Sequence, residues 1–183
     1  MKPIHSQKTI DTALISLFAA IIAVCAWITV PSAIAFTLQT FGIFCACVIL
    51  GGKRATISVL VYILMGAVGV PVFSNFSGGL GVLFSATGGY IVGFIFLVLT
   101  YWLVTHSSNS TFRMVLGLVL GLLVCYIFGT VWFMLLYAKN TGEIGIATAF
   151  AQCVLPFIIP DTLKLILAVL VGKKVAKRLN LQP

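Results

Sequence analysis

Residues 115–137, VLGLVLGLLVCYIFGTVWFMLLY, form a run of 23 residues without a charged side chain. A helix needs about 20 apolar residues to cross the hydrocarbon core of a bilayer, so this run predicts a transmembrane helix. The whole chain has the same character, because 61% of its 183 residues are hydrophobic and only 8% are charged. Water-soluble domains usually carry about a quarter charged residues. The composition therefore predicts an all-α integral membrane protein.

Five further apolar runs extend this prediction to a bundle of six transmembrane helices. The six spans lie at about residues 12–30, 38–50, 55–70, 83–104, 115–137 and 150–171. The second run is short for a span, and the sixth is interrupted by Pro156 and Pro160. We expect a single transmembrane domain, residues 1–183, that lies in the cell membrane and contacts the lipid bilayer on all sides.

The positive charges orient this bundle. If the N-terminus is cytoplasmic, nine of the 11 Lys and Arg residues fall in inner segments: Lys2, Lys8, Lys53, Arg54, Arg113, Lys173, Lys174, Lys177 and Arg178. The positive-inside rule then predicts that both termini are cytoplasmic. The net charge of +8 does not indicate nucleic-acid binding, because no polar domain is available to form a binding groove.

The three outer connections of this topology are residues 31–37, 71–81 and 138–145. The second connection combines Pro, Gly, Phe and uncharged polar residues, so it is too irregular for a helix and too apolar for a fully solvated loop. Such backbone is tolerated at membrane depth only where it is buried in protein or lines a cavity. We expect an irregular capping or re-entrant loop near residues 71–81, with an ordinary surface loop as the alternative.

Signatures of catalysis are absent from the sequence. The pairs Gly52-Lys53 and Gly172-Lys173 are followed by Arg54 and Lys174 rather than Ser or Thr, so neither is a phosphate-binding Walker loop. Zinc-binding His-Glu-x-x-His and nucleophile-exposing Gly-x-Ser-x-Gly motifs are also missing. The five cysteines are odd in number and all lie in apolar runs, which favours packed thiols over a disulfide framework. We expect no catalytic residues, no metal site and no cofactor.

Asp161 and Lys164 are the one pair of opposite charges within an apolar run. Three positions apart, they share a face of a helix. A single charge at the bilayer centre costs at least about 3 kcal/mol on insertion scales, and ionisable residues there are by default candidates for a functional site. Pro160 suits the first turn of a helix, which would place Asp161 near a helix N-terminus. A purely structural salt bridge is the alternative interpretation.

Other polar and aromatic residues are expected in the same outer half of the membrane. They are Thr37, Gln39, Asn75, Thr87, Gly88, Gly89, Tyr90 and Trp132. Apolar walls with a few polar groups are the usual form of a small-molecule site. Trp132 fits either this pocket or the aromatic belt at a membrane interface. The residues alone predict a pocket for a small nutrient with a polar head.

Several short runs together resemble the BioY family, the biotin-binding S components of energy-coupling factor (ECF) transporters. They are Phe36-Thr37-Leu38-Gln39, residues 66–73 (GAVGVPVF), Gly78-Gly79, residues 87–94 (TGGYIVGF) and Pro156-Phe157-x-x-Pro160-Asp161-x-x-Lys164. The resemblance covers nearly the whole chain. It implies a six-helix bundle that captures biotin from outside and has no ATPase of its own. Transport would be driven by a transmembrane coupling subunit and two ABC-type ATPases.

The resemblance also implies roles for individual residues. Asp161 would accept a hydrogen bond from a ureido N–H of biotin, and Lys164 would donate to the ureido carbonyl or, as the weaker option, to the carboxylate. The remaining members of the expected site are the polar residues Asn75, Thr87, Tyr90, Gln39 and Thr37, the glycines Gly79 and Gly88, and the apolar walls Phe36, Phe73 and Trp132.

A small-residue pair on the first helix matches the family's docking signature for the coupling subunit. It is Ala19-x-x-x-Ala23, and small residues at this spacing let two helices approach closely. Packing inside the chain's own bundle is the alternative. A different class of function, a self-sufficient secondary transporter or channel, predicts paired interrupted helices in two repeated halves, and we find no such internal repetition.

Overall fold

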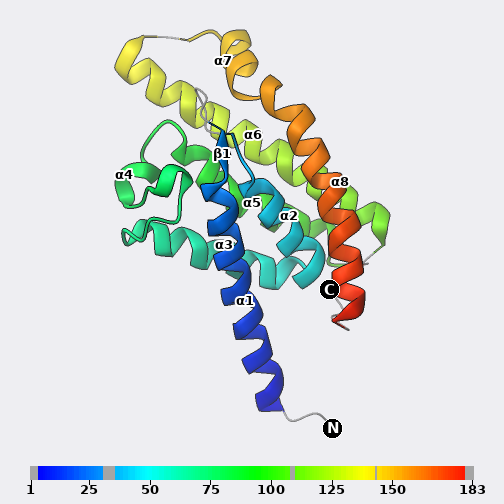
Figure 1. Ribbon diagram of the computed structural model, residues 1–183. Coiled ribbons are helices and arrows are strands. Elements are labelled where there is room, and N and C mark those ends of the chain that lie inside the picture. Colours follow the sequence, from blue (N-terminus) through cyan, green and yellow to red (C-terminus); the bar gives the residue numbers. More distant parts are fainter. Residues whose placement is uncertain (1–3, 31–35, 108–109, 143, 180–183) are drawn as a thin grey trace.

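The computed structural model describes residues 4–30, 36–107, 110–142 and 144–179 (Figure 1). Within these residues the regular secondary structure is helical apart from one short strand pair. The elements are α1 (Ile4–Trp27), β1 (Thr29–Val30), β2 (Phe36–Thr37), α2 (Gln39–Leu50), α3 (Gly52–Ala67), the 3-10 turn η1 (Ser74–Phe76), α4 (Leu80–Leu83), α5 (Gly88–Thr105), α6 (Thr111–Thr141), α7 (Ile146–Cys153) and α8 (Leu155–Arg178).

Four segments of the described chain are long and apolar enough to cross a membrane. They are Gln7–Trp27, Gly88–Thr105, Thr111–Lys139 and Ile146–Arg178, and α2 is a shorter apolar helix of 12 residues. This confirms the predicted all-helical membrane protein. The count of six spanning helices and the orientation of the termini stay predictions. In Figure 1, α1 begins and α8 ends toward the lower end of the view, whereas β1 and α7 lie at the upper end.

The first helix differs in position from its predicted span. It begins at Ile4 and ends at Trp27, rather than covering residues 12–30. The chain then forms a two-residue antiparallel ribbon, in which Thr29 pairs with Thr37 and Val30 with Phe36. The rest of the predicted first connection, residues 31–35, lies outside the described residues. The ribbon brings Phe36 and Thr37 back over the end of α1.

The sixth predicted span is two helices rather than one. Helix α7 ends at Cys153, Val154 breaks the helical backbone, and α8 starts at Leu155 with Pro156 in its first turn and Pro160 inside it. The expectation that Pro160 begins the helix is therefore wrong. Pro156 occupies the position where a missing N–H leaves no bond unmade, so Asp161 lies almost two turns from the helix N-terminus.

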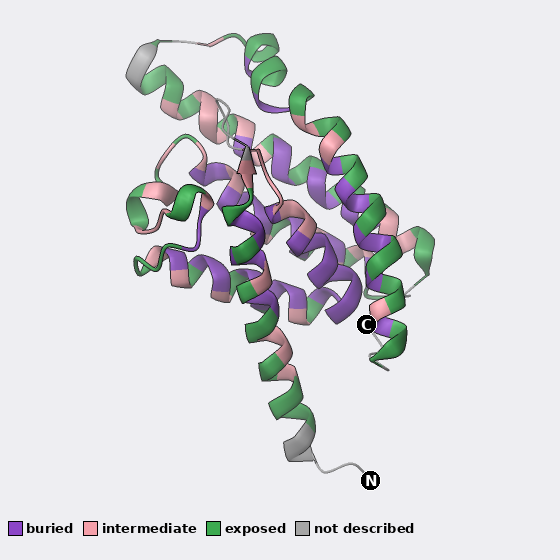
Figure 2. Cartoon of the chain, viewed as in Figure 1, coloured by how far each residue is buried: buried purple, intermediate pink, exposed green. Residues whose placement is uncertain are grey.

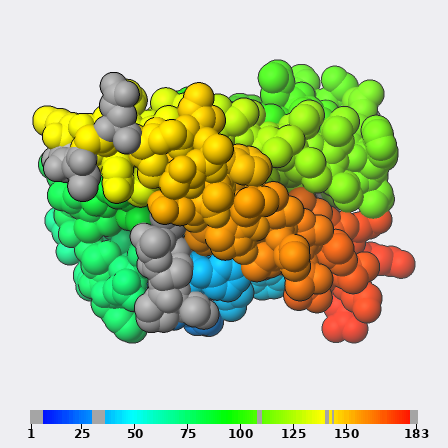
Figure 3. All heavy atoms as spheres, turned by 90° about the horizontal axis from the view of Figure 1, so that it is seen from above, coloured from blue at the N-terminus to red at the C-terminus, as the bar shows by residue number. Residues whose placement is uncertain are grey.

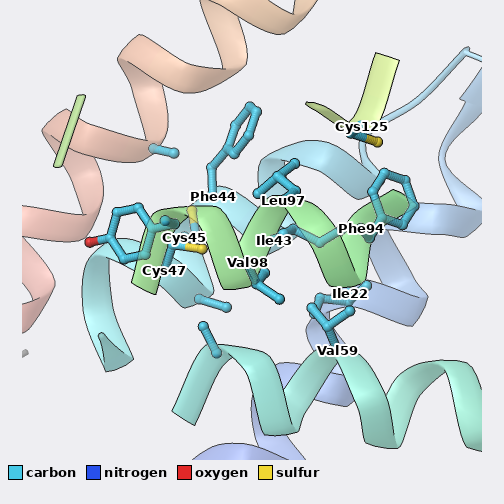
Figure 4. Packing of buried hydrophobic residues seen from close by; sticks show 14 of the residues in the cluster. Ile22, Ile43, Phe44, Cys45, Cys47, Val59, Phe94, Leu97, Val98 and Cys125 are labelled. Atoms are coloured by element: carbon cyan, nitrogen blue, oxygen red, sulfur yellow. The ribbon is translucent and has the colours of Figure 1, made fainter. Parts of the chain in front are cut away.

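Helix α2 forms the centre of the core. Ten of its 12 residues are buried, and Figure 2 shows it purple along nearly its whole length while the lower part of α1 is largely exposed. A helix that is apolar on all sides is expected to be buried. Ile22 of α1, Val59 of α3 and Leu97 of α5 belong to the same buried cluster as Ile43 of α2 (Figure 4). All five cysteines are buried and free.

Glycines allow α5 and α6 to pack closely. A Cβ atom on Gly93 would lie 2.9 Å from the Cys125 sulfur, and one on Gly121 would lie 2.6 Å from the Leu97 carbonyl oxygen. A Cβ on Gly129 would overlap the ring of Tyr90. Small residues at helix contacts permit this close approach within membranes. The packing places Tyr90 and Tyr126 on facing helices beside the same cavity.

Candidate substrate-binding site

A partly enclosed cavity of about 70 Å³ lies between α2, α5, α6 and the α7–α8 segment. Figure 3 views this end of the molecule, with α7 and the first part of α8 (orange) across the middle and the end of α6 (yellow) beside them. The described residues that line the cavity are Thr37, Gln39, Thr40, Ser74, Thr87, Tyr90, Ile91, Phe94, Leu122, Cys125, Tyr126, Cys153, Phe157, Asp161 and Lys164. Six of them belong to the site predicted from sequence: Thr37, Gln39, Thr87, Tyr90, Asp161 and Lys164.

Asp161 accepts three hydrogen bonds in the cavity wall, although only 2% of it is exposed. Its Oδ1 accepts from Thr40 Oγ1 at 2.9 Å and from Lys164 Nζ at 2.8 Å, and its Oδ2 accepts from the Tyr126 hydroxyl at 2.6 Å. A carboxylate offers about four acceptor positions. Among the described residues Oδ2 accepts this one hydrogen bond, so it retains an acceptor position.

Lys164 is 6% exposed and uses its ammonium hydrogens within the protein. Nζ donates to the Thr37 carbonyl oxygen at 2.7 Å, to Asp161 Oδ1 at 2.8 Å and to Thr40 Oγ1 at 3.2 Å, and it lies 4.1 Å from the centre of the Phe36 ring. An ammonium group has three hydrogens and no acceptor. In this arrangement Lys164 has no hydrogen left for a ligand, and instead it ties β2 to α8 and orients Asp161.

A second set of hydrogen bonds connects the cavity to the 71–81 segment. The buried Gln39 side chain donates from Nε2 to the Tyr62 hydroxyl at 2.8 Å, and that hydroxyl donates to the Val72 carbonyl oxygen at 3.2 Å. The Gln39 backbone N–H donates to Thr37 Oγ1 at 3.2 Å. Gln39 thus holds the start of α2, the β2 strand and the 71–81 segment in one arrangement.

The 71–81 segment is irregular, as the sequence predicts, and contacts with α3 anchor it. Phe73 is fully buried, lies against Gly66 and contacts the Tyr62 ring edge-on, with centroids 5.6 Å apart. Gly79 has a φ of 94° and donates from its N–H to the Gly66 carbonyl oxygen at 2.7 Å. Neither Phe73 nor Gly79 lines the cavity among the described residues. Both secure the segment whose residue Ser74 lines the cavity.

The tip of this segment places Ser74, rather than Asn75, in the cavity wall. Asn75 and Phe76 both adopt left-handed backbone, with φ values of 55° and 54°. That conformation is uncommon for residues other than glycine. The Phe76 ring stacks on Trp27 at 5.1 Å, and Trp27 Nε1 donates to the Pro71 carbonyl oxygen at 2.9 Å. Asn75 is exposed at the rim beside Ser74.

Gly88 and Trp132 support the site from outside its lining. Trp132 Nε1 donates to the Ser85 carbonyl oxygen at 3.1 Å. A Cβ on Gly89 would overlap Trp132, and one on Gly88 would overlap the Leu83 carbonyl. These glycines let the turn before α5 close against α6. This close packing positions Tyr90, whose hydroxyl lies 3.0 Å from Thr130 Oγ1.

Besides Ser74, sequence reasoning missed two polar residues of the cavity, Thr40 and Tyr126. Thr40 is 121 positions from its partner Asp161, and Tyr126 is 35 positions from it. The available signal for Tyr126 is its spacing of four from Thr130, which puts two hydroxyls on one face of an apolar helix. Thr40 directly follows the quoted run Phe36-Thr37-Leu38-Gln39 but is not part of it. Phe157, also in a quoted motif, stacks on Phe36 at 6.1 Å.

The small residues of α1 lie on two different faces. Ala19 and Ala23 are 1% and 4% exposed, so they pack inside the bundle. Ala13, Ser16 and Ala20 are exposed, on an adjacent part of the helix surface. In this structure the exposed small residues of α1 are therefore not the Ala19-x-x-x-Ala23 pair.

The comparisons with known proteins agree with this architecture. The sequence profile that describes the BioY family matches residues 1–181. A biotin transporter BioY from Thermotoga maritima is 36% identical over 162 residues, which cover 88% of this chain and 92% of the relative. A probable biotin transporter BioY from Pyrococcus horikoshii is 35% identical over 169 residues, covering 92% of this chain and 97% of the relative.

A solved structure has the same fold. The S-component for biotin from an ECF-type ABC transporter superposes with a TM-score of 0.83 over 96% of this chain and 95% of that chain, at 24% sequence identity. The profile match spans nearly the whole sequence, and the first two relatives are more than 30% identical over most of both chains. The chain is a multi-pass protein of the prokaryotic plasma membrane and belongs to the BioY family.

Proposed function

We propose that this chain is the biotin-binding membrane subunit of an ECF-type ABC importer. It captures biotin from outside the cell and delivers it inward together with a coupling subunit and two ABC-type ATPases. The observation that carries the proposal is the buried carboxylate of Asp161, which lines a mostly apolar cavity and whose Oδ2 accepts one hydrogen bond among the described residues. The relatives named biotin transporters and the shared fold support it.

The chemistry of biotin suits this cavity. Its ureido ring carries two N–H donors and one carbonyl acceptor, and its thioether ring is apolar. One ureido N–H donates to Asp161 Oδ2, and the apolar ring contacts Ile91, Leu122 and Phe157. Most of a small ligand's surface is buried against such walls, while a few polar groups set its orientation.

The remaining polar contacts, the 71–81 segment and the topology complete this proposal. Thr87, Tyr90 and Gln39 are further polar contacts for the ureido ring. The valerate tail leaves past Ser74 and Asn75 at the rim. With six spans and cytoplasmic termini, α2 and α3 are the two shorter spans, and the cavity faces the outside beneath the 71–81 segment.

Leu122→Trp tests whether this cavity holds biotin. Leu122 lines the cavity from α6, and an indole in its place would occupy the space of the ligand without removing a hydrogen-bonding group. We expect the unsubstituted protein to bind biotin and the variant to bind at least about 100-fold more weakly, or about 2.7 kcal/mol. Isothermal titration calorimetry on detergent-purified protein measures both affinities.

Leu120→Trp is the matched control. Leu120 lies two positions earlier on α6, is exposed and does not line the cavity among the described residues, so its replacement should leave biotin affinity unchanged. Absence of biotin binding by the unsubstituted protein would overturn the proposed function. Unchanged biotin affinity in Leu122→Trp would show that biotin binds elsewhere on the chain.

Docking of the coupling subunit is proposed on the exposed face of α1, with Ser16 and Ala20 in place of the buried Ala19 and Ala23. Replacing Ser16 and Ala20 together by Leu adds bulk where a second helix would approach closely. We expect the variant to lose most of its copurification with the coupling subunit while its biotin affinity stays unchanged. Quantitative pull-down with tagged coupling subunit measures the first property.

Ala151→Leu on α7 provides the same change at another exposed position and should leave copurification intact. Equal recovery of the coupling subunit with the Ser16→Leu/Ala20→Leu variant would place docking on a different surface of the chain.

A further inference from the structure

A second and larger cavity, of about 710 Å³, lies at the opposite end of the bundle from the biotin cavity. Its walls come from the first turns of α1, the junction of α2 and α3, and the end of α5. Lys8 lies near the start of the candidate span Gln7–Trp27, and Thr105 ends the span Gly88–Thr105. The cavity is therefore at the level of one membrane surface, where lipid headgroups lie.

The charges that line this cavity are mainly positive. Among the described residues they are Lys8, Lys53 and Arg54 against the single acid Asp11. Arg54 Nη2 donates to Asp11 Oδ1 at 2.9 Å, and these two side chains are 28% and 38% exposed. Neither Lys8 nor Lys53 forms an ion pair within the described chain. Two exposed ammonium groups are thus available to an anion.

The backbone at the same place adds to the positive field. Gly51 has a φ of 78°, which allows an abrupt change of direction between α2 and α3. The 16-residue helix α3 then starts at Gly52, and both glycines line the cavity. The first N–H groups of a helix carry partial positive charge and favour anions, phosphate among them. This effect supports the two lysines rather than forming a site alone.

Apolar side chains also line the cavity, together with the polar residues Thr12, Thr105 and His106. Ile15, Ile57 and Trp102 line the cavity beside the cations, and Ile57 is exposed on the outer face of α3. A free phosphate ion would use only the charged part of this surface. A molecule with an anionic head and hydrocarbon chains would use both parts.

We propose that this cavity binds an anionic membrane phospholipid, with its phosphate between Lys8 and Lys53 and its acyl chains along Ile57 and Trp102. Basic pockets between transmembrane helices near a membrane surface bind such headgroups in other proteins. The proposal is independent of the biotin site, because it shares no residue with that cavity.

The test is native mass spectrometry of the purified chain with phosphatidylglycerol, phosphatidylcholine and inorganic phosphate as separate probes. The Lys8→Gln/Lys53→Gln variant should bind phosphatidylglycerol about 10- to 30-fold more weakly, since each surface lysine contributes about a factor of five toward anionic lipid. Phosphatidylcholine binding should not change. Lys173→Gln/Lys174→Gln removes two charges at the end of α8 and should leave phosphatidylglycerol binding unchanged.

A variant that is expected to raise lipid affinity makes the test stricter. Asp11→Asn frees Arg54 from its ion pair and should raise the affinity for phosphatidylglycerol several-fold. Unchanged phosphatidylglycerol affinity in the double lysine variant would overturn the proposal. Binding of inorganic phosphate as tight as that of phosphatidylglycerol would make the cavity a free-anion site. Loss of an ATPase or coupling subunit from pull-downs without any change in lipid affinity would make it a protein contact.

Discussion

Asp161→Asn and Lys164→Met, made separately, are each expected to lower the free energy of unfolding by about 3–5 kcal/mol, because each leaves one buried charge without its partner. The ion pair is 2.8 Å long and the two side chains are only 4% and 7% exposed. The double variant Asp161→Asn/Lys164→Met should recover most of this loss, since no uncompensated charge remains. Thermal unfolding of the detergent-purified proteins measures the order of stability among the unsubstituted protein, the two single variants and the double variant.

Biotin affinity separates the two interpretations of this pair. If Asp161 accepts from the ureido ring, the double variant stays folded and still binds biotin about 10- to 150-fold more weakly, corresponding to about 1.5–3 kcal/mol for a hydrogen bond to a charged group. A purely structural salt bridge predicts instead that the double variant binds biotin as the unsubstituted protein does.

The exposed ion pair between Arg54 and Asp11 provides the control. Its distance is 2.9 Å, close to that of the buried pair, but both side chains are partly exposed. Exposed ion pairs contribute about 0–1 kcal/mol. Arg54→Gln should therefore change neither the unfolding midpoint nor biotin affinity to a comparable degree.

Gly66→Ala should detach the 71–81 segment from the bundle. A Cβ atom on Gly66 would overlap the ring of Phe73, which is fully buried there. Displacing a buried Phe side chain costs about 3–5 kcal/mol on the scale of Phe-to-Ala substitutions. We expect a lower unfolding temperature and weaker biotin binding, because Phe73, Gly79 and the Tyr62 contact together hold the 71–81 segment in place beside the cavity.

A compensating change makes this prediction specific. Phe73→Leu creates room for the added methyl group, so Gly66→Ala/Phe73→Leu should be more stable than Gly66→Ala alone. Gly81→Ala, in the same region, meets no atom within 4 Å and should behave like the unsubstituted protein. A Gly66→Ala variant with normal stability and affinity would show that Phe73 is not the anchor of this segment.

Several features of the fold follow from local sequence. Runs of apolar residues near 20 in length identify membrane helices because the bilayer sets that length. The irregular 71–81 segment is visible because Pro and Gly interrupt helices wherever they cluster. Asp161 and Lys164 stand out since a charge in an apolar run is costly in any arrangement. None of these inferences requires knowledge of which helices are neighbours.

Other features depend on neighbours and were not accessible from the sequence. The sequence predicts Pro160 at the start of a helix, but Pro156 takes that position and α8 continues through Pro160. Ala19 and Ala23 are small and regularly spaced, yet they face the core while Ser16 and Ala20 face outward. In lipid both faces of a helix are apolar, so periodicity does not reveal which face is buried.

The sequence by itself determined that this chain is a helical membrane protein with one buried pair of opposite charges and an irregular segment near it. Only the tertiary structure decided which groups that pair contacts. Thr40 and Tyr126 donate hydrogen bonds to Asp161 from helices far away in the chain. The Thr37 carbonyl oxygen accepts a hydrogen bond from Lys164 Nζ. Hydrogen bonds are short and directional, so which acceptor position stays open depends on three-dimensional distances that residue spacing does not encode.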